Sequence, residues 1–242
     1  MKLQQGENEM GIYLNPENVD FQEVLNSKIY VDKSELIQYT NSVLRTTQKY
    51  ICVSRPRRFG KSMAANMLTA YYSRGCDSRG LFQGLKIATH SDFEKYLNQY
   101  NVIHLNMRDY LTESENMKEL IQFVEDDLLD ELQQEFSDIR MPRRKTLVKV
   151  LEQAFVQYKI PFVFIIDEWD CIFRVHKSDA ASQKEYLDFL RNLLKDKSYI
   201  ALAYMTGILP IKKYGEHSAI NVFYEHSMTD ASPIEEFTGF TE

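Results

Sequence analysis

The stretch SRPRRFGKSM, residues 54–63, decides the fold because it ends like a phosphate-binding loop, with Gly60, Lys61 and Ser62 in order. The general pattern of such loops is G-x-x-x-x-G-K-[ST], and Arg55 occupies the position of its first glycine. The stretch alone is therefore compatible with a working phosphate cradle, with a degenerate one, or with a solvated basic turn.

The sequence on either side of the loop favours the phosphate cradle. KYICVS, residues 49–54, is short, apolar and β-rich, which predicts a buried strand. A helix is predicted from Gly60 to about Arg74, with four apolar residues on one side: Met63, Met67, Leu68 and Tyr71. A strand, a loop and a helix in this order form the context that a phosphate loop requires.

The residue types in the loop suit a nucleotide phosphate chain. Backbone N–H groups at a helix N-terminus attract phosphate oxygens, and a lysine can reach the β- and γ-phosphates. Gly60 would permit the tight turn, Lys61 would be the phosphate lysine, and Ser62 would offer its hydroxyl to Mg²⁺. We predict nucleotide contacts from seven consecutive residues: Arg57, Arg58, Phe59, Gly60, Lys61, Ser62 and Met63.

A second motif further along the chain supplies acids. PFVFIIDE, residues 161–168, is the most hydrophobic predicted strand, and its unbroken apolar run indicates burial on both faces. It ends in Asp167, which would hold Mg²⁺, and in Glu168, which would polarise the attacking water as in a Walker B motif. The alternative interpretation is that both acids simply end the strand in solvent.

Several residues near these acids are further candidates. Thr206 ends another predicted strand and would sense the γ-phosphate, although a threonine before a glycine could equally be a turn residue. Asp170 is interpreted as a structural acid and Trp169 as a packing residue. The predicted catalytic residues are Glu168, Lys61 and Thr206. Three arginines are equal candidates for an arginine finger: Arg57, Arg58 and Arg174.

The order of predicted elements defines the fold class. Further strands are predicted at 101–107, 199–207 and 219–227, and further helices at 117–136, 145–158 and 182–195. Strands that alternate with helices predict a parallel sheet covered on both sides. We expect an α/β P-loop NTPase fold, with three α/β/α layers around a mainly parallel five-stranded sheet. Residues 1–12 are expected to be a flexible tail, and residues 13–242 one ATPase domain.

Composition restricts the classes of function. The 242 residues are 44% hydrophobic and 26% charged, which is typical of a globular protein, and the net charge of −6 gives no general attraction to nucleic acid. No apolar run approaches a membrane span, and the N-terminus is polar where a signal peptide is apolar. Three scattered cysteines, Cys52, Cys76 and Cys171, fit reduced thiols, so a cytoplasmic location is expected.

Taken together, the motifs resemble the bacterial AAA-ATPase-like family of P-loop ATPases, whose members often carry a C-terminal PD-(D/E)XK nuclease domain. Seven ordered stretches carry the resemblance: KIYVDKSELI (28–37), SRPRRFGKSM (54–63), GLFQGLKI (80–87), FIIDEWD (164–170), YMTGILPIKKYG (204–215), SAINVFYEHSMTD (218–230) and EFTGFTE (236–242). In this family the loop reads R-P-R-R-F-G-K-S/T, so Arg55 matches the family pattern. The resemblance implies an AAA-like sheet with an additional strand, and ATP and Mg²⁺ as cofactors. AAA-type proteins often form rings, which makes a homo-oligomer one possible assembly, whereas a fragment without its lid is compatible with a monomer.

The resemblance also implies regions that this sequence does not contain. Family members continue past GFTE into a lid-like region and often into the nuclease, so a chain that ends at Glu242 is expected to be a fragment or a short member. The nuclease signature needs an acid two positions before a lysine, and no lysine here has one. A nuclease domain is therefore an expected partner in longer relatives only, and no membrane contact is expected.

Three other functions are compatible with parts of the sequence. A nucleotide-binding scaffold without hydrolysis would have no need of Glu168. HKSD, residues 176–179, is similar to the guanine-specifying N-K-x-D, but histidine replaces the asparagine and the motif follows Asp167 too closely. RPRR (55–58) and MPRRK (141–145) could contact nucleic acid, although short basic runs on an acidic chain are typical of solvated faces.

The segment YVDKS, residues 30–34, has two interpretations. It could place Asp32 or Lys33 near the adenine side of the site. Alternatively, Asp32 is the N-cap of a helix and Glu35, three residues later, completes a capping box. The capping pattern favours the second interpretation.

Overall fold

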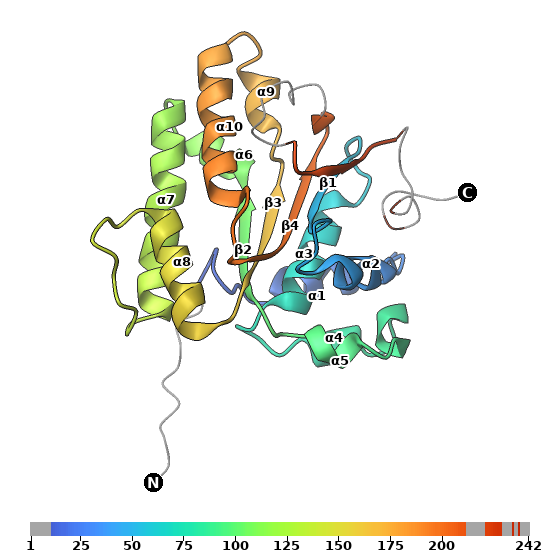
Figure 1. Ribbon diagram of the computed structural model, residues 1–242. Coiled ribbons are helices and arrows are strands. Elements are labelled where there is room, and N and C mark those ends of the chain that lie inside the picture. The colour runs from blue at the N-terminus through green and yellow to red at the C-terminus, as the bar shows by residue number, and fades with distance from the viewer. Residues whose placement is uncertain (1–10, 212–220, 229–233, 235–236, 238–242) are drawn as a thin grey trace.

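The computed structural model describes residues 11–211, 221–228, 234 and 237, and a parallel sheet forms its centre (Figure 1). The strands are β1 (Tyr50–Ser54), β2 (Asn101–Asn106), β3 (Phe162–Asp167), β4 (Ile200–Gly207) and β5 (Tyr224–His226). Their order across the sheet is β2-β3-β4-β1-β5, and neighbouring strands pair in parallel throughout. Because β4 lies between β1 and β3, the prediction of an additional-strand P-loop fold is confirmed.

Helices cover both faces of the sheet (Figure 1). One layer contains α1 (Val19–Leu25), α2 (Glu35–Val43), α3 (Lys61–Tyr72), α4 (Arg79–Phe82), the 3₁₀ helix η1 (Lys86–Thr89) and α5 (Phe93–Tyr96). The other contains α6 (Met107–Glu113), α7 (Met117–Glu135), α8 (Leu147–Tyr158), α9 (Cys171–Val175) and α10 (Ala180–Leu194). Alternate side chains of β3 serve the two layers: Phe162, Phe164 and Ile166 pack with the second, Val163 and Ile165 with the first. The predicted three layers are confirmed.

The long predicted elements are present with small changes at their ends. The helices predicted at 117–136, 145–158 and 182–195 are α7, α8 and α10. The strand predicted at 219–227 is too long, because β5 comprises only Tyr224–His226, and positions 219 and 220 lie outside the described residues. No helix of the described chain is both long and apolar enough to cross a membrane.

The free edge of β2 is covered by a segment near the N-terminus. Leu14 forms an antiparallel bridge with Ile103, and the backbone N–H of Asn15 donates to the carbonyl of Val102 at 2.7 Å. The carboxylate of Glu131 on α7 accepts the backbone N–H groups of residues 12–14, at 2.7, 3.0 and 2.6 Å. A single glutamate thus anchors the segment that protects the sheet edge from pairing with another chain. Of the predicted tail, residues 1–10 lie outside the described residues.

We predict that Glu131→Ala lowers the free energy of unfolding by about 2–4 kcal/mol, because hydrogen bonds to a charged group contribute about 1.5–3 kcal/mol each and add incompletely. Denaturant titration measures the loss, and amide exchange at residues 12–14 should become faster. Glu125→Ala on the same helix is the matched control, since no side-chain hydrogen bond of Glu125 is present within the described residues. Equal stability of the two variants would contradict the anchoring role.

Candidate functional site

The predicted phosphate loop joins β1 to α3 at the carboxyl edge of the sheet. α3 begins at Lys61, and its N-cap Gly60 has a left-handed backbone with φ +74°. That conformation is costly for any residue with a Cβ atom, so the tight turn requires glycine here. The twelve residues of α3 direct the positive end of the helix dipole at the loop.

Arg55, at the position of the missing first glycine, has a structural role in the sheet. Its side chain is buried, with 2% of its surface exposed. Its backbone N–H donates to the carbonyl of Gly207 at 3.0 Å, which extends the pairing of β1 with β4. Its Nη1 donates to the carbonyls of Ser54 and of His226 on β5, at 3.1 and 2.8 Å. Arg55 therefore attaches the loop to the edge strand instead of pointing into the cradle.

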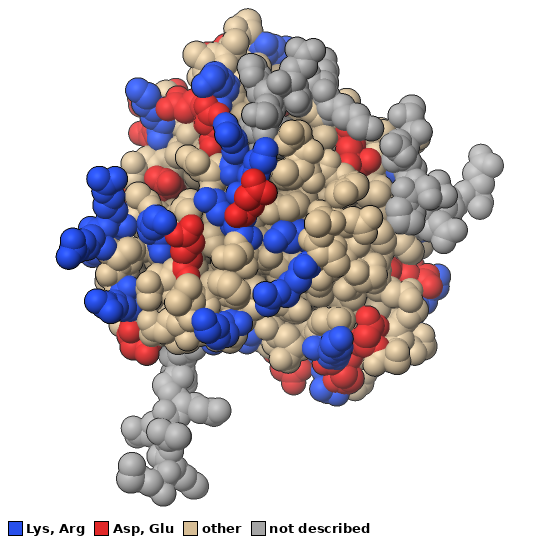
Figure 2. Space-filling view, in the orientation of Figure 1, with Lys and Arg blue, Asp and Glu red and all other residues tan. Residues whose placement is uncertain are grey.

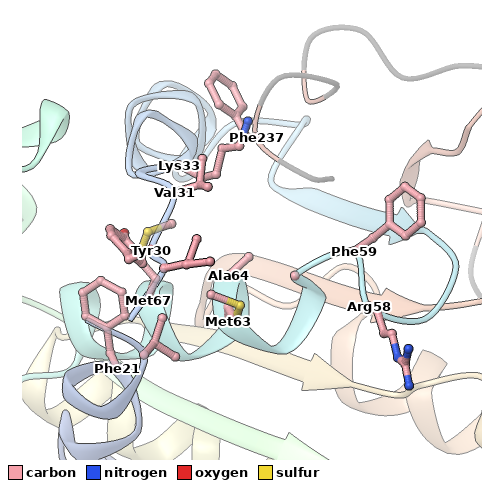
Figure 3. Close-up of a pocket in the computed structure, with 13 residues that line it drawn as sticks. Phe21, Tyr30, Val31, Lys33, Arg58, Phe59, Met63, Ala64, Met67 and Phe237 are labelled. Atoms are coloured by element: carbon pink, nitrogen blue, oxygen red, sulfur yellow. The ribbon is translucent and has the colours of Figure 1, made fainter. Parts of the chain in front are cut away.

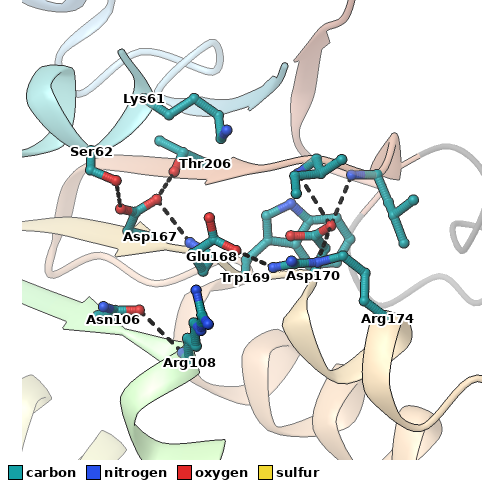
Figure 4. A network of polar contacts seen from close by, with 12 residues as sticks. Lys61, Ser62, Asn106, Arg108, Asp167, Glu168, Trp169, Asp170, Arg174 and Thr206 are labelled. Atoms are coloured by element: carbon teal, nitrogen blue, oxygen red, sulfur yellow. Dashed lines mark hydrogen bonds and ion pairs between the residues drawn. The ribbon is translucent and has the colours of Figure 1, made fainter. Parts of the chain in front are cut away.

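Lys61 lies over the acidic end of β3 (Figure 4). Its side chain is buried at 6% exposure, and its Nζ donates to the carbonyl of Pro56 at 3.0 Å. Burial lowers the pKa of the Lys61 ammonium, while the carboxylates of Glu168 and Asp167 oppose that shift. The ammonium is thus partly desolvated and hydrogen-bonded to a neutral carbonyl. An anionic oxygen can take the place of that carbonyl.

Asp167 is the centre of a network that joins three elements. Ser62 at the start of α3 donates its hydroxyl to Oδ2 of Asp167 at 2.5 Å. Thr206 near the end of β4 donates its hydroxyl to Oδ1, which also accepts the backbone N–H of Glu168 at 2.9 Å. The structure therefore brings together Ser62, Asp167 and Thr206, three residues that are far apart in the sequence (Figure 4).

Glu168 leaves β3 in an unusual conformation, with φ +53°. A non-glycine residue in the left-handed region carries backbone strain, which recurs at functional sites. One carboxylate oxygen, Oε2, accepts a hydrogen bond from Nη2 of Arg174 on α9. Figure 4 shows the other oxygen directed towards the side on which Ser62 and Lys61 lie.

Asp170 and Trp169 follow the two acids in the chain and are both buried, in keeping with the structural and packing roles that the sequence predicts. Asp170 is fully buried, and its Oδ2 accepts the backbone N–H groups of residues 208 and 209 at 3.1 and 2.8 Å. Arg174 Nε lies 3.2 Å from the same oxygen, but its N–H is not aimed at it, so this contact is an ion pair only. Trp169 is buried and packs edge-on against Phe173, with 5.5 Å between the ring centroids.

Comparison with known proteins is informative at the level of the family. A family model described as "Predicted AAA-ATPase" matches residues 19–215. The chain belongs to this AAA-ATPase-like family. Membership of this family indicates that the chain is an ATP-binding, ATPase-like domain. No curated protein matches the sequence. Among solved structures, C. elegans PCH-2 is similar with a TM-score of 0.38 and 12% identity, over 86% of this chain and 46% of that one.

The remaining predicted contacts of this AAA-ATPase-like chain divide into two groups. Arg57 and Arg58 are exposed, and within the described residues neither forms an ion pair. Arg58 belongs to the lining of the neighbouring cavity, together with Phe59, Gly60 and Met63 (Figure 3). Lys61 and Ser62 instead bind Pro56 and Asp167, so the seven consecutive residues do not form one contact surface.

The cavity beside α3 has a volume of about 430 Å³ and is mostly apolar (Figure 3). Its walls come from α1, the segment before α2, the phosphate loop, α3 and Phe237. Three apolar side chains in its lining are notably exposed to solvent: Ile29, Val31 and Met63. The sequence predicted nucleotide contacts for Arg58, Phe59, Gly60 and Met63 of this lining and, in one of two interpretations, a place near the adenine for Lys33. The other lining residues were not identified, because the cavity is formed by segments that meet only in the fold.

Three further motifs are local structure. The N-cap of α2 is Ser34, so the predicted capping box is wrong: Asp32 instead accepts the backbone N–H groups of Ser34 and Lys86, at 2.9 and 2.8 Å. Asp179 of HKSD caps α10 by accepting the backbone N–H of Ser182, which lowers the pKa of Asp179. MPRRK lies between α7 and α8, and Figure 2 shows basic side chains at that edge of the molecule.

Sequence reasoning left Arg174 among three equal candidates, and the structure distinguishes it by its two carboxylate partners. Asp170 and Arg174 are four residues apart, the spacing of neighbours on a helix surface. A prediction of α9 would therefore have indicated the pairing of Arg174 with Asp170, but not its pairing with Glu168. Glu168, the other partner, has a positive φ, which no sequence pattern indicated.

We predict that Gly207→Ala lowers the free energy of unfolding by about 1–3 kcal/mol, because a Cβ atom there would lie 2.7 Å from both Asp170 Oδ1 and Trp169 Nε1. Thermal and denaturant unfolding measure the effect. Gly80→Ala is the control, since its Cβ would meet nothing within 4 Å, and its stability should stay within about 0.5 kcal/mol of the wild type. A neutral Gly207→Ala would contradict the close packing of this loop against the acids.

Proposed function

We propose that this chain binds Mg·ATP and hydrolyses it at the carboxyl edge of the sheet. The observation that carries the proposal is the contact of Ser62 and Thr206 with one carboxylate, Asp167, directly beneath a buried lysine at a helix N-terminus. A phosphate chain and a cation need a helix N-terminus, an ammonium, a hydroxyl and a carboxylate in this arrangement.

The phosphates would bind at the start of α3. Lys61 would exchange the carbonyl of Pro56 for β- and γ-phosphate oxygens, with a gain because a neutral acceptor is replaced by an anionic one. The same exchange offsets the desolvation of the ammonium that lowers the Lys61 pKa. Gly60 leaves the approach to the helix N-terminus open, since nothing lies within 4 Å of its Cβ position.

The oxygens of Ser62 and Asp167 suit Mg²⁺, which takes one or two protein oxygens and completes its shell with water and phosphate. Ser62 Oγ and Asp167 Oδ2 are 2.5 Å apart, so one cation could contact both oxygens. The cation would neutralise the charge on the phosphates. Thr206 would hold Oδ1 of Asp167, the carboxylate that binds the cation, and would sense the γ-phosphate through that carboxylate.

Glu168 would orient the attacking water and accept its proton. Its Oε2 is held by Arg174, and its other oxygen is directed towards the proposed phosphate site (Figure 4). A carboxylate with one anchored and one available oxygen can bind a water molecule in a defined direction. Coupling of hydrolysis to an effector domain, such as a nuclease in longer relatives, is part of this proposal and rests on the family resemblance.

The base would occupy the apolar cavity on the other side of α3. Ligand cavities typically have volumes of about 300–1,000 Å³ and apolar walls, and this one is within that range. Ala64 and Met67 on α3 line it one and two turns after the phosphate lysine, so phosphates at the helix start and a base in the cavity fit one nucleotide. The exposed Val31 and Met63 would be covered by the ring.

We predict that Lys61→Ala weakens ATP binding at least about tenfold, because the partly desolvated ammonium no longer meets the phosphates. Glu168→Gln should bind Mg·ATP as the wild type does but release phosphate about 10²–10⁴-fold more slowly, since glutamine cannot accept a proton. Calorimetry and a phosphate-release assay measure the two effects. Lys184→Ala on α10 is the control for loss of a lysine.

Two outcomes would change the proposed function. Unchanged ATP affinity in Lys61→Ala would show that the loop is not a phosphate cradle. Tight ATP binding by a wild-type chain that releases no phosphate would instead favour the nucleotide-binding scaffold.

We predict that Ala64→Leu weakens ATP binding about tenfold but leaves binding of inorganic triphosphate unchanged, because leucine fills the base cavity and leaves the phosphate loop intact. Ala181→Leu at an exposed position of α10 is the matched control. Calorimetry with both ligands gives the comparison. Equal loss for ATP and triphosphate would assign the effect to the loop, and no loss for either would place the base elsewhere.

A further inference from the structure

We propose that Arg174 is the positioning residue of Glu168, an arginine within the same chain that directs the available carboxylate oxygen at the water. The inference rests on the proposed hydrolysis and adds a residue to it. Its basis is the ion pair of Arg174 Nη2 with Glu168 Oε2, together with the second ion contact of Arg174 Nε with Asp170 Oδ2.

The two contacts fix the guanidinium from two sides. Asp170 is fully buried, and two backbone N–H groups of the loop after β4 already bind its Oδ2, so this carboxylate cannot move freely. Arg174 itself is in α9, whose first turn follows directly after Asp170. An arginine held by an immobile acid is a fixed donor for the more exposed Glu168.

Glu168 needs such a donor because of its place in the chain. It is the first residue after β3, it has a strained φ of +53°, and its side chain is 18% exposed. A glutamate has three side-chain torsions, and an unpaired one would lose most of its orientation in solvent. With Oε2 bound to Arg174, the remaining oxygen is directed towards the start of α3 (Figure 4).

The same contacts distinguish Arg174 from the other arginine candidates. Arg57 and Arg58 are exposed and have no ion-pair partner within the described residues, so either is available to a ligand or to another chain. Arg174 is engaged with two carboxylates of its own chain, and its side chain is 20% exposed. An arginine finger must reach a phosphate, whereas a positioning arginine must keep its carboxylate. The pairing of Arg174 with Glu168 and Asp170 is that of a positioning arginine.

A double-mutant cycle on turnover tests the role. Arg174→Met keeps a long apolar side chain and removes the charge, and we expect kcat to fall about 10–100-fold while the Kd for Mg·ATP stays within about twofold. Combined with Glu168→Gln, the same change should cause no further loss, because Arg174 acts only through Glu168. Arg174→Lys, which keeps a charge but not the planar fork, should restore part of kcat.

Arg79→Ala is the matched control, since Arg79 forms an exposed ion pair with Glu94 on the other layer, and it should leave kcat unchanged. A full further loss in the double variant would overturn the proposal in favour of direct phosphate contact. If Arg174→Met has the kcat of the wild type, the ion pair of Arg174 with Glu168 is a structural contact only, and the positioning role is wrong. If Arg174→Met does not fold, kcat of Arg174→Lys at wild-type ATP affinity decides the question, and an unchanged value would overturn the role.

The two levels of the proposal fail in different ways. A wild-type chain that binds ATP without turnover would refute both hydrolysis and the role of Arg174. Turnover that depends on Glu168 but is insensitive to Arg174 would refute only the latter.

Discussion

The contact on which the rest of the site depends is the carboxylate of Asp167 with its three donors. At 5% exposure this charge has lost most of its water, so it must be compensated by hydrogen bonds within the protein. The donors come from the start of α3, the end of β4 and the backbone after β3. Satisfying one buried charge therefore fixes the relative positions of the phosphate loop and two central strands, and it gives the candidate site its shape before any ligand binds.

A second set of buried polar groups lies around this contact and holds the connections at the same edge of the sheet. Glu225 on β5 accepts the hydroxyl of Ser54 and the backbone N–H of Ile211, at 3.2 and 2.7 Å. Arg55 binds the carbonyl of His226 on the same strand, and Asp170 accepts two N–H groups just after β4. Because buried backbone groups need partners, these loops adopt one conformation together. The edge strand is thereby connected to the phosphate loop.

The central elements were predictable because each has a strong local pattern. FVFIID is apolar throughout, as a strand covered on both faces must be, and α7 repeats its apolar residues at three and four positions. β5 was predicted too long because an edge strand pairs on one side only, and pairing with β1 covers just three residues. The helices α6 and α9 are too short to show a period. The cap of α2 was misassigned because Asp32 binds a distant backbone group, that of Lys86, instead of starting the helix.

The sequence by itself determined the fold class and most residues of the candidate site, since GKS after an apolar strand and DE at the end of another are local patterns with a physical cause. Only the tertiary structure decided how these residues are paired. Arg55 is buried against β5, and Arg174 rather than Arg57 or Arg58 meets Glu168. The cavity beside α3 likewise combines segments that are separate in the sequence. Side-chain partners across the fold depend on strand order and backbone direction, which no stretch of neighbouring residues encodes.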